Sequence, residues 1–188
     1  MRQTIREVEV NRPTHVFVQA GVGSLAGGVV GYFANLYPNN PPKFIVMEAG
    51  AADCLYKGAE AGDGEPRIVG GDLQTIMAGL ACGEPNTIGW DILRNHVSAF
   101  ISCPDWVSAK GMRMLAAPVK GDPSVTSGES GAVGMGVISS IMTDDAYKEL
   151  REALELDNSS QVLMFSTEGD TDPDKYKKIV WGGEYPTV

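Results

Sequence analysis

The sequence predicts an α/β fold, in which helices cover both faces of a mostly parallel sheet. Three observations lead to this prediction. Short apolar runs alternate along the chain with longer stretches of helical periodicity, and glycine-rich or polar turns separate them. The third observation concerns size: 188 residues without an internal repeat are enough for one domain with a sizeable core. We therefore expect residues 1–188 to form a single domain.

The strands are expected where apolar residues follow one another without interruption, as in strands buried on both faces. These runs are Thr14–Gln19, Lys43–Glu48, the short stretches Arg67–Val69 and Phe100–Ser102, and Gln161–Phe165.

Helices are expected between these strands. Their ranges are Leu25–Tyr37, Ala51–Ala61, Leu73–Ala81, Ile88–Ser98, a segment from Pro104-Asp105 to about Leu115, and the glycine-rich Gly128–Met142, which must be closely packed. A further helix should begin at Thr143 as N-cap, with Tyr147, Leu150 and Leu154 on its buried face.

Charge and hydropathy exclude several classes of partner. The chain carries 15 basic and 24 acidic residues, a net charge of −9, and no basic cluster, so a nucleic acid is not an expected partner. No stretch reaches the ~20 apolar residues of a membrane span, and the charged N-terminus lacks a signal-peptide core. We expect a cytoplasmic protein that does not enter a membrane.

The cysteines and histidines do not suggest a metal site. Cys54, Cys82 and Cys103 form no CxxC pair, and His15 and His96 are far apart in sequence. A Cys54–Cys82 disulfide is possible, but buried free thiols are the preferred interpretation. Two acids near a later turn, Asp170 and Asp172, suggest either a monovalent-cation site or, as we prefer, a solvated loop.

The most informative segment is the glycine turn between the first strand and the first helix. It contains Gly21, Val22, Gly23, Ser24 and Leu25. Amides at a helix N-terminus lack intrahelical acceptors and carry a partial positive charge, and glycine lets an oxygen-rich ligand approach closely. The turn therefore predicts a site for a phosphate-bearing cofactor. Ser24 either donates to that phosphate or simply caps the helix.

A second turn, Ser166–Gly169, follows the last strand. Because ligands of parallel sheets bind at the carboxyl ends of the strands, the two turns are expected to form one site. One interpretation of this site is a dinucleotide-binding unit: Gly21 to Ala26 fits G-x-G-x-x-G/A, and Glu48 lies 25 residues after Gly23, close to the position of a ribose-binding acid.

Four segments, taken together and in order, resemble another family. They are Gln19–Gly27, Asp53–Leu55, Thr75–Pro85 and Ser127–Ala132. They are similar to the diaminopropionate ammonia-lyases, pyridoxal-phosphate enzymes of the tryptophan-synthase-β group, or fold type II. The resemblance implies a partial fold of that type and a lyase that converts 2,3-diaminopropionate to pyruvate and ammonia.

The resemblance also implies which residues contact the cofactor. Gly21, Val22, Gly23, Ser24 and Leu25 match the phosphate-binding turn. Ser166 best matches the hydroxyl that faces the pyridine nitrogen, with Thr167 as the second choice. Glu129, with Ser127 and Ser130, either lines the pocket near the ring or acts only as an acid at a helix start.

The match implies a C-terminal portion that lacks the family's Schiff-base lysine. No catalytic residue is expected in this chain, and its lysines are expected to be solvated charges: Lys43, Lys57, Lys110, Lys120, Lys148, Lys175, Lys177 and Lys178. The expected partners are an amino-acid substrate, the missing N-terminal half in the same or a separate polypeptide, and further copies of this chain, which cover exposed apolar surface. A non-catalytic subunit of a split lyase remains an alternative.

Overall fold

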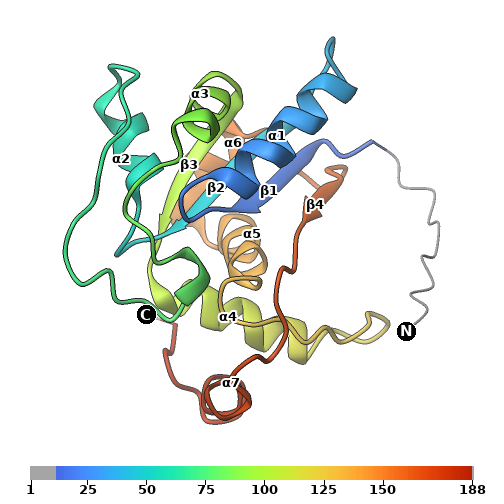
Figure 1. Cartoon of the computed structure of the whole chain (residues 1–188). Coiled ribbons are helices and arrows are strands. Elements are labelled where there is room, and N and C mark those ends of the chain that lie inside the picture. The colour runs from blue at the N-terminus through green and yellow to red at the C-terminus, as the bar shows by residue number, and fades with distance from the viewer. Residues whose placement is uncertain (1–11, 188) are drawn as a thin grey trace, which may run out of the picture.

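A four-stranded parallel sheet forms the centre of the computed structural model, which describes residues 12–187 (Figure 1). The strands are β1 (His15–Gln19), β2 (Lys43–Ala49), β3 (Val97–Cys103) and β4 (Val162–Met164). Their order in the sheet is β3-β2-β1-β4, and every neighbouring pair runs parallel. The expected α/β class is confirmed.

Alternate residues of the two central strands enter two different cores. Phe17 and Ile45 point into one apolar cluster, whereas Val18 and Val46 point into the other. This alternation follows from the two-residue period of a strand, and it explains why Val16–Val18 of β1 and Phe44–Met47 of β2 are all apolar.

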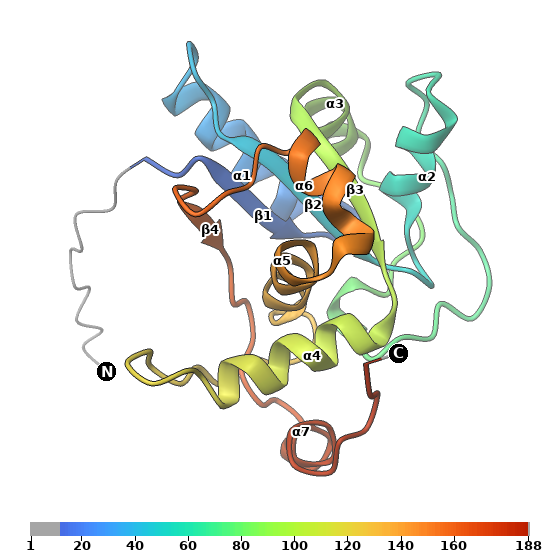
Figure 2. The same cartoon turned by 180° about the vertical axis from the view of Figure 1, so that it is seen from behind.

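Helices cover both faces of the sheet (Figures 1 and 2). On one face lie α1 (Ser24–Leu36), α2 (Cys54–Ala61) and α3 (Thr87–His96). On the other lie α4 (Asp105–Ala116), α5 (Val133–Thr143), α6 (Lys148–Ala153) and α7 (Pro173–Val180). Two short 3₁₀ turns, Ala78–Leu80 and Asp145–Tyr147, complete the elements of the described chain.

Gly111 of α4 and Gly136 of α5 permit a close crossing of these two helices. A Cβ added to Gly136 would lie 1.9 Å from the Val107 carbonyl oxygen of α4, and one added to Gly111 would lie 2.0 Å from the Ala132 carbonyl oxygen. The expectation that this segment is closely packed is therefore confirmed, because any side chain at these two positions would push α4 and α5 apart.

Two expected elements are wrong. Arg67–Val69 is not a strand, and Leu73–Ala81 contains only the 3₁₀ turn at its end. In the second case, tertiary contacts replace helical hydrogen bonds: the Asp105 carboxylate accepts bonds from the Thr75 hydroxyl and from the Ile76 amide, 3.2 Å away. An extended segment whose polar groups are satisfied in this way does not need to form a helix.

Some boundaries also differ. The helix expected over Ile88–Ser98 ends at His96, because Val97 already pairs with Phe44 of β2. The helix expected from Gly128 begins only at Val133.

The last two helices differ as well. Thr143 is the last residue of α5 and not an N-cap; Asp144 caps the following turn instead, accepting from the Ala146 amide at 2.9 Å. The α7 helix was not expected. It begins after Asp172, whose side chain accepts from the Lys175 amide, so this acid is a helix cap. None of the helices in the described part of the chain combines the length and apolar character needed to cross a membrane.

Candidate functional site

The two turns expected to form one site line the same cavity. It has a volume of about 480 Å³ and lies where β1 ends and α1 begins. Its wall consists of Gln19, Ala20, Gly21, Val22, Gly23, Ser24, Leu25, Gly79, Leu80, Cys82, Ser130, Thr167 and Glu168. This is the carboxyl edge of the sheet, where parallel α/β folds bind their ligands.

The glycine turn leaves several backbone amides free. Gly23 caps α1 in the left-handed region, with φ of 91°, and its carbonyl oxygen accepts from the Gly27 amide at 2.8 Å. Within residues 12–187, the amides of Val22, Gly23, Ser24 and Leu25 donate to no backbone or side-chain acceptor. Unsatisfied donors at a helix N-terminus, open to a cavity, are suited to bind an anion.

The N-terminus of α3 holds this turn in place. The Asn86 amide donates to the Val22 carbonyl oxygen at 2.7 Å, and the Asn86 side chain caps α3 by accepting from Gly89 at 2.7 Å. A Cβ added to Gly89 would lie 2.8 Å from the Gly23 carbonyl oxygen. The position of the turn therefore depends on the close approach of α1 and α3.

A buried glutamine joins the two turns. Gln19 is 2% exposed, and its side-chain nitrogen donates to the Phe165 carbonyl oxygen and to the Thr167 hydroxyl oxygen, each at 2.8 Å. Thr167 lines the cavity, but Ser166 does not. Ser166 Oγ lies 2.9 Å from the hydroxyl of the buried Ser127. Of the two candidate hydroxyls, the structure brings only Thr167 to the glycine turn.

Glu168 connects the second turn to the segment before α5. Its Oε1 accepts from the amides of Ser130 and, at 3.3 Å, Gly131. Ser130 in turn accepts from the Gly79 amide at 3.2 Å. Glu168 lies in the turn expected at the site but was given no role there, and Gly79 was not expected at the site, because these contacts join segments that are distant in sequence.

Glu129 does not line this cavity. Its carboxylate lies 3.4 Å from the Lys175 ammonium group on α7, and only 11% of its side chain is exposed. Lys175 also donates to the Ile76 carbonyl oxygen at 3.3 Å. The expectation that Lys175 is a solvated charge is therefore wrong. No lysine lines the cavity in the described residues.

Glu48 cannot serve as a ribose-binding acid. It is fully buried, and its two oxygens accept from the amides of Leu55 and Tyr56 at 2.9 and 2.7 Å. Burial raises the pKa of this carboxyl to about 8, although the two amide bonds oppose the shift. The interpretation as a dinucleotide-binding unit is wrong in the role it gave to Glu48, because this side chain caps α2.

The cysteines are free thiols, and Cys82 is exposed, contrary to the expectation of burial, whereas Cys54 and Cys103 are buried. Burial raises the pKa of both buried thiols to about 12, so neither is a nucleophile near neutral pH.

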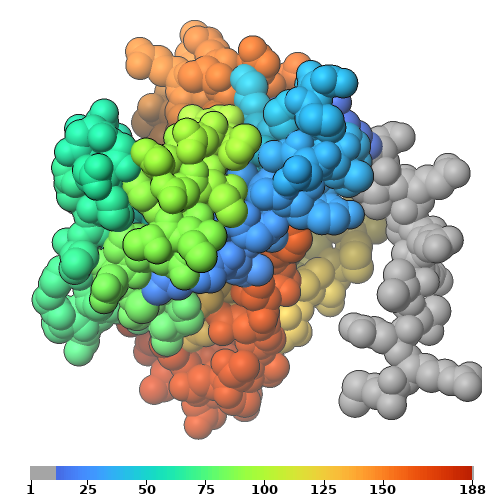
Figure 3. Space-filling model, turned by 45° about the horizontal axis from the view of Figure 1, so that its top comes forward, coloured from blue at the N-terminus to red at the C-terminus, as the bar shows by residue number. Residues whose placement is uncertain are grey.

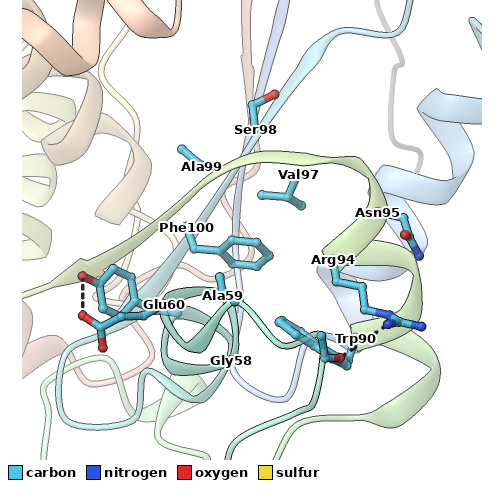
Figure 4. A pocket seen from close by; sticks show the side chains of 13 residues that line it. Gly58, Ala59, Glu60, Trp90, Arg94, Asn95, Val97, Ser98, Ala99 and Phe100 are labelled. Atoms are coloured by element: carbon cyan, nitrogen blue, oxygen red, sulfur yellow. Dashed lines mark hydrogen bonds between the residues drawn. The ribbon is translucent and has the colours of Figure 1, made fainter.

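A larger cavity lies elsewhere, as Figure 4 shows. Its volume is about 640 Å³, and it lies along the outer edge of β3, between α2 and α3. Trp90 and Phe100 form much of its wall, with Arg94 at one side. Arg94 pairs with Asp91, and the Trp90 indole donates to the Gly64 carbonyl oxygen. Because its polar groups are already paired and it adjoins the first half of β3, we do not regard it as the main site.

Comparison with known proteins agrees with the fold. A family model described as pyridoxal-phosphate dependent enzyme matches residues 1–168. A diaminopropionate ammonia-lyase of Salmonella typhimurium is 51% identical over 182 residues, 96% of this chain and 45% of that protein. This chain therefore spans less than half the length of that relative.

Solved structures are similar as well. The Escherichia coli diaminopropionate ammonia lyase in complex with an aminoacrylate–PLP azomethine reaction intermediate superposes with a TM-score of 0.83 at 49% identity, over 92% of this chain and 43% of that one. Maize serine racemase, at 20% identity, gives a TM-score of 0.69 over 93% of this chain and 48% of that one, which concerns the fold alone.

Proposed function

Because the chain belongs to the family of pyridoxal-phosphate dependent enzymes, we propose that its glycine turn holds the phosphate group of pyridoxal phosphate. The observation that carries the proposal is the set of amides from Val22 to Leu25, which belong to residues lining a cavity of about 480 Å³ and have no acceptor within the described chain. Such donors, together with the dipole of α1, stabilise a dianionic phosphate.

The residues of the site fit the cofactor. A Cβ at Gly23 would lie 3.1 to 3.3 Å from the side chains of Leu55 and Leu93, so only glycine leaves the turn undistorted at φ of 91°. In the same cavity wall, Thr167 supplies a hydroxyl for the pyridine nitrogen. We prefer Thr167 to Ser166 in this role because only Thr167 lines the cavity.

When bound, pyridoxal phosphate supplies an electron sink for bond breaking at the α-carbon of an amino acid. The chain's own residues bind and orient: the turn amides hold the phosphate, and Thr167 fixes the ring end. Glu168 keeps the segment with Ser130 and Gly131 against the cavity. We propose an ammonia-lyase acting on 2,3-diaminopropionate, on the basis of the similarity to the Salmonella typhimurium protein.

The proposal assigns the reacting lysine to a part of the enzyme outside residues 1–188. Two observations support it: the chain spans 45% of the relative, and no lysine lines the cavity in the described residues. We propose that the chain corresponds to a C-terminal portion, 1–188 forming one domain, that is inactive alone and is completed by an N-terminal half in the same or a separate polypeptide.

Binding can be tested by titrating the purified chain with pyridoxal phosphate, pyridoxal and NADH. We expect thermal protection by pyridoxal phosphate and much less by pyridoxal, which lacks the phosphate. Protection by NADH alone would overturn the proposal.

Activity requires a separate experiment. The chain is mixed with pyridoxal phosphate and diaminopropionate, and pyruvate is followed over time. We expect no sustained turnover by the chain alone and turnover after addition of the first half of the related lyase. Sustained turnover by residues 1–188 alone would contradict the assignment of the lysine to a part outside them.

We further propose that the chain self-associates. Figure 3 shows α1 and α3 side by side on the surface. Leu25, Tyr32 and Leu36 of α1 and Ile88 of α3 are between 48% and 73% exposed, and α1 contains no charged residue. An uncharged apolar helix face is typical of a surface that another molecule covers. Light scattering at high protein concentration tests this: we expect a mass above that of a monomer, and a monomer would contradict the proposal. The free thiols support a reducing, cytoplasmic location.

A further inference from the structure

We propose that Gln19 is a positioning residue, which directs the hydroxyl proton of Thr167 into the cavity. The cavity wall at Thr167 then presents a hydrogen-bond donor, which favours a ligand ring whose nitrogen is unprotonated and accepts. This inference rests on the proposed function, because it concerns the ring end of the same cavity.

The orientation of the Gln19 amide follows from its partners. The Phe165 carbonyl oxygen can only accept a hydrogen bond, so the end of Gln19 that lies 2.8 Å from it must be the nitrogen. The same nitrogen lies 2.8 Å from Thr167 Oγ1. Both protons of the amide nitrogen are therefore used, one on each partner.

The direction of the Thr167 proton follows from this. A threonine hydroxyl has one proton and two lone pairs. One lone pair accepts from Gln19, and this amide nitrogen cannot accept in return. Thr167 Oγ1 has no other protein partner in the part of the chain that the structure describes, and the residue lines the cavity. Its proton is thus available to a bound ligand.

Burial makes this arrangement rigid. Gln19 is the last residue of β1 and is 2% exposed, with β2 and β4 on either side of its strand. The bond to the Phe165 carbonyl oxygen holds the buried amide in place, so its second proton stays directed at the more exposed Thr167. The Gln19 side chain bonds to Phe165 and Thr167 and to no group of the glycine turn, so its loss should reach the ligand through Thr167 and leave the turn amides in place.

The test compares Gln19→Met, Thr167→Val and the double variant in the full chain. Gln19→Met keeps the length of the side chain and removes both donors. We expect it to raise the dissociation constant of pyridoxal phosphate about five-fold, the effect of one hydrogen bond. The dissociation constant of inorganic phosphate, which tests the turn alone, should not change. In the Thr167→Val background, Gln19→Met should have no further effect.

A spectroscopic measurement provides a second criterion. The absorbance of the bound cofactor is followed as the pH is lowered, and protonation of the pyridine nitrogen should occur at a higher pH in Gln19→Met than in the wild-type chain. Gln19→Glu should behave in the same way, because a carboxylate accepts the Thr167 proton. If the methionine variant does not fold, Gln19→Glu takes its place in the pH titration. Thr167→Ser, which keeps the hydroxyl, should resemble the wild type.

Several results would overturn the inference. One is an equal loss of affinity from Gln19→Met with and without the Thr167 hydroxyl, and another is an equal loss for inorganic phosphate, since each indicates a merely structural role. Unchanged binding in Gln19→Met, with normal binding by the wild type, would overturn this inference alone. A wild-type chain that binds phosphate but not pyridoxal phosphate would overturn the proposed function together with it.

Discussion

The substitution Glu48→Gln tests how a buried carboxyl supports the edge of the site. Glu48 is the second-last residue of β2. Its carboxylate lies at the N-terminus of α2, where its oxygens accept from the Leu55 and Tyr56 amides. Its pKa in the folded chain is raised from 4.5 to about 8, chiefly by burial and partly by the nearby Asp53. In the unfolded chain, the carboxyl should titrate near 4.5.

The sign of the pH dependence follows from these two values. Between pH 4.5 and 8, the folded chain keeps the Glu48 proton while the unfolded chain releases it, so unfolding becomes easier as the pH rises. Each pH unit in this window should lower the free energy of unfolding by about 1.4 kcal/mol through this group, with a limit of about 5 kcal/mol over the window. Glu48→Gln has no such group and should not show this loss.

The assay is urea unfolding of the wild-type and Glu48→Gln chains at pH 5, 6, 7 and 8. We expect the wild type to lose stability relative to the variant steadily across this range. Glu60→Gln is the matched control, because this exposed carboxylate on the same helix pairs with Lys57, which holds its pKa below the usual value. Parallel pH profiles for wild type and Glu48→Gln would refute the argument.

Three further predictions concern the turn and the thiols. Gly23→Ala should destabilise the chain by about 1–3 kcal/mol, as measured by urea unfolding, because an alanine at φ of 91° is strained and crowds two leucines. Gly89→Ala should weaken the binding of pyridoxal phosphate, since its Cβ would lie 2.8 Å from the Gly23 carbonyl oxygen, whereas Gly28→Ala, which meets no atom within 4 Å, should not. Iodoacetamide at pH 8 should label Cys82 and leave the two buried thiols unmodified in the folded chain, as mass spectrometry would detect.

Much of the sheet and the position of the glycine turn were predictable from local signals. The apolar runs of β1 and β2 are characteristic of strands buried on both faces, and the glycines that follow β1 mark a tight turn into a helix. Each of these features depends on neighbours in sequence. The segment Leu73–Ala81 was misjudged because its hydrogen-bond partner, Asp105, is distant in sequence.

The ring end of the site depended on long-range contacts. Ser166 and Thr167 are adjacent, and sequence alone cannot say which hydroxyl enters the cavity. Gln19 decides this by bonding to a residue 148 positions away. Likewise, Glu129 faces Lys175 on α7, a helix whose capping residue, Asp172, was interpreted as part of a solvated loop. Such pairings arise only when the strands assemble.

The most direct test of the central claim is an amide NMR titration of the ¹⁵N-labelled chain, whose mass is 20.0 kDa. If the turn binds the cofactor phosphate, pyridoxal phosphate should shift the amide signals of Val22, Gly23, Ser24 and Leu25 more than any others. Inorganic phosphate should shift the same signals, and pyridoxal should leave them nearly unchanged. Unchanged turn amides in the presence of bound pyridoxal phosphate, or equal shifts with pyridoxal, would contradict the claim.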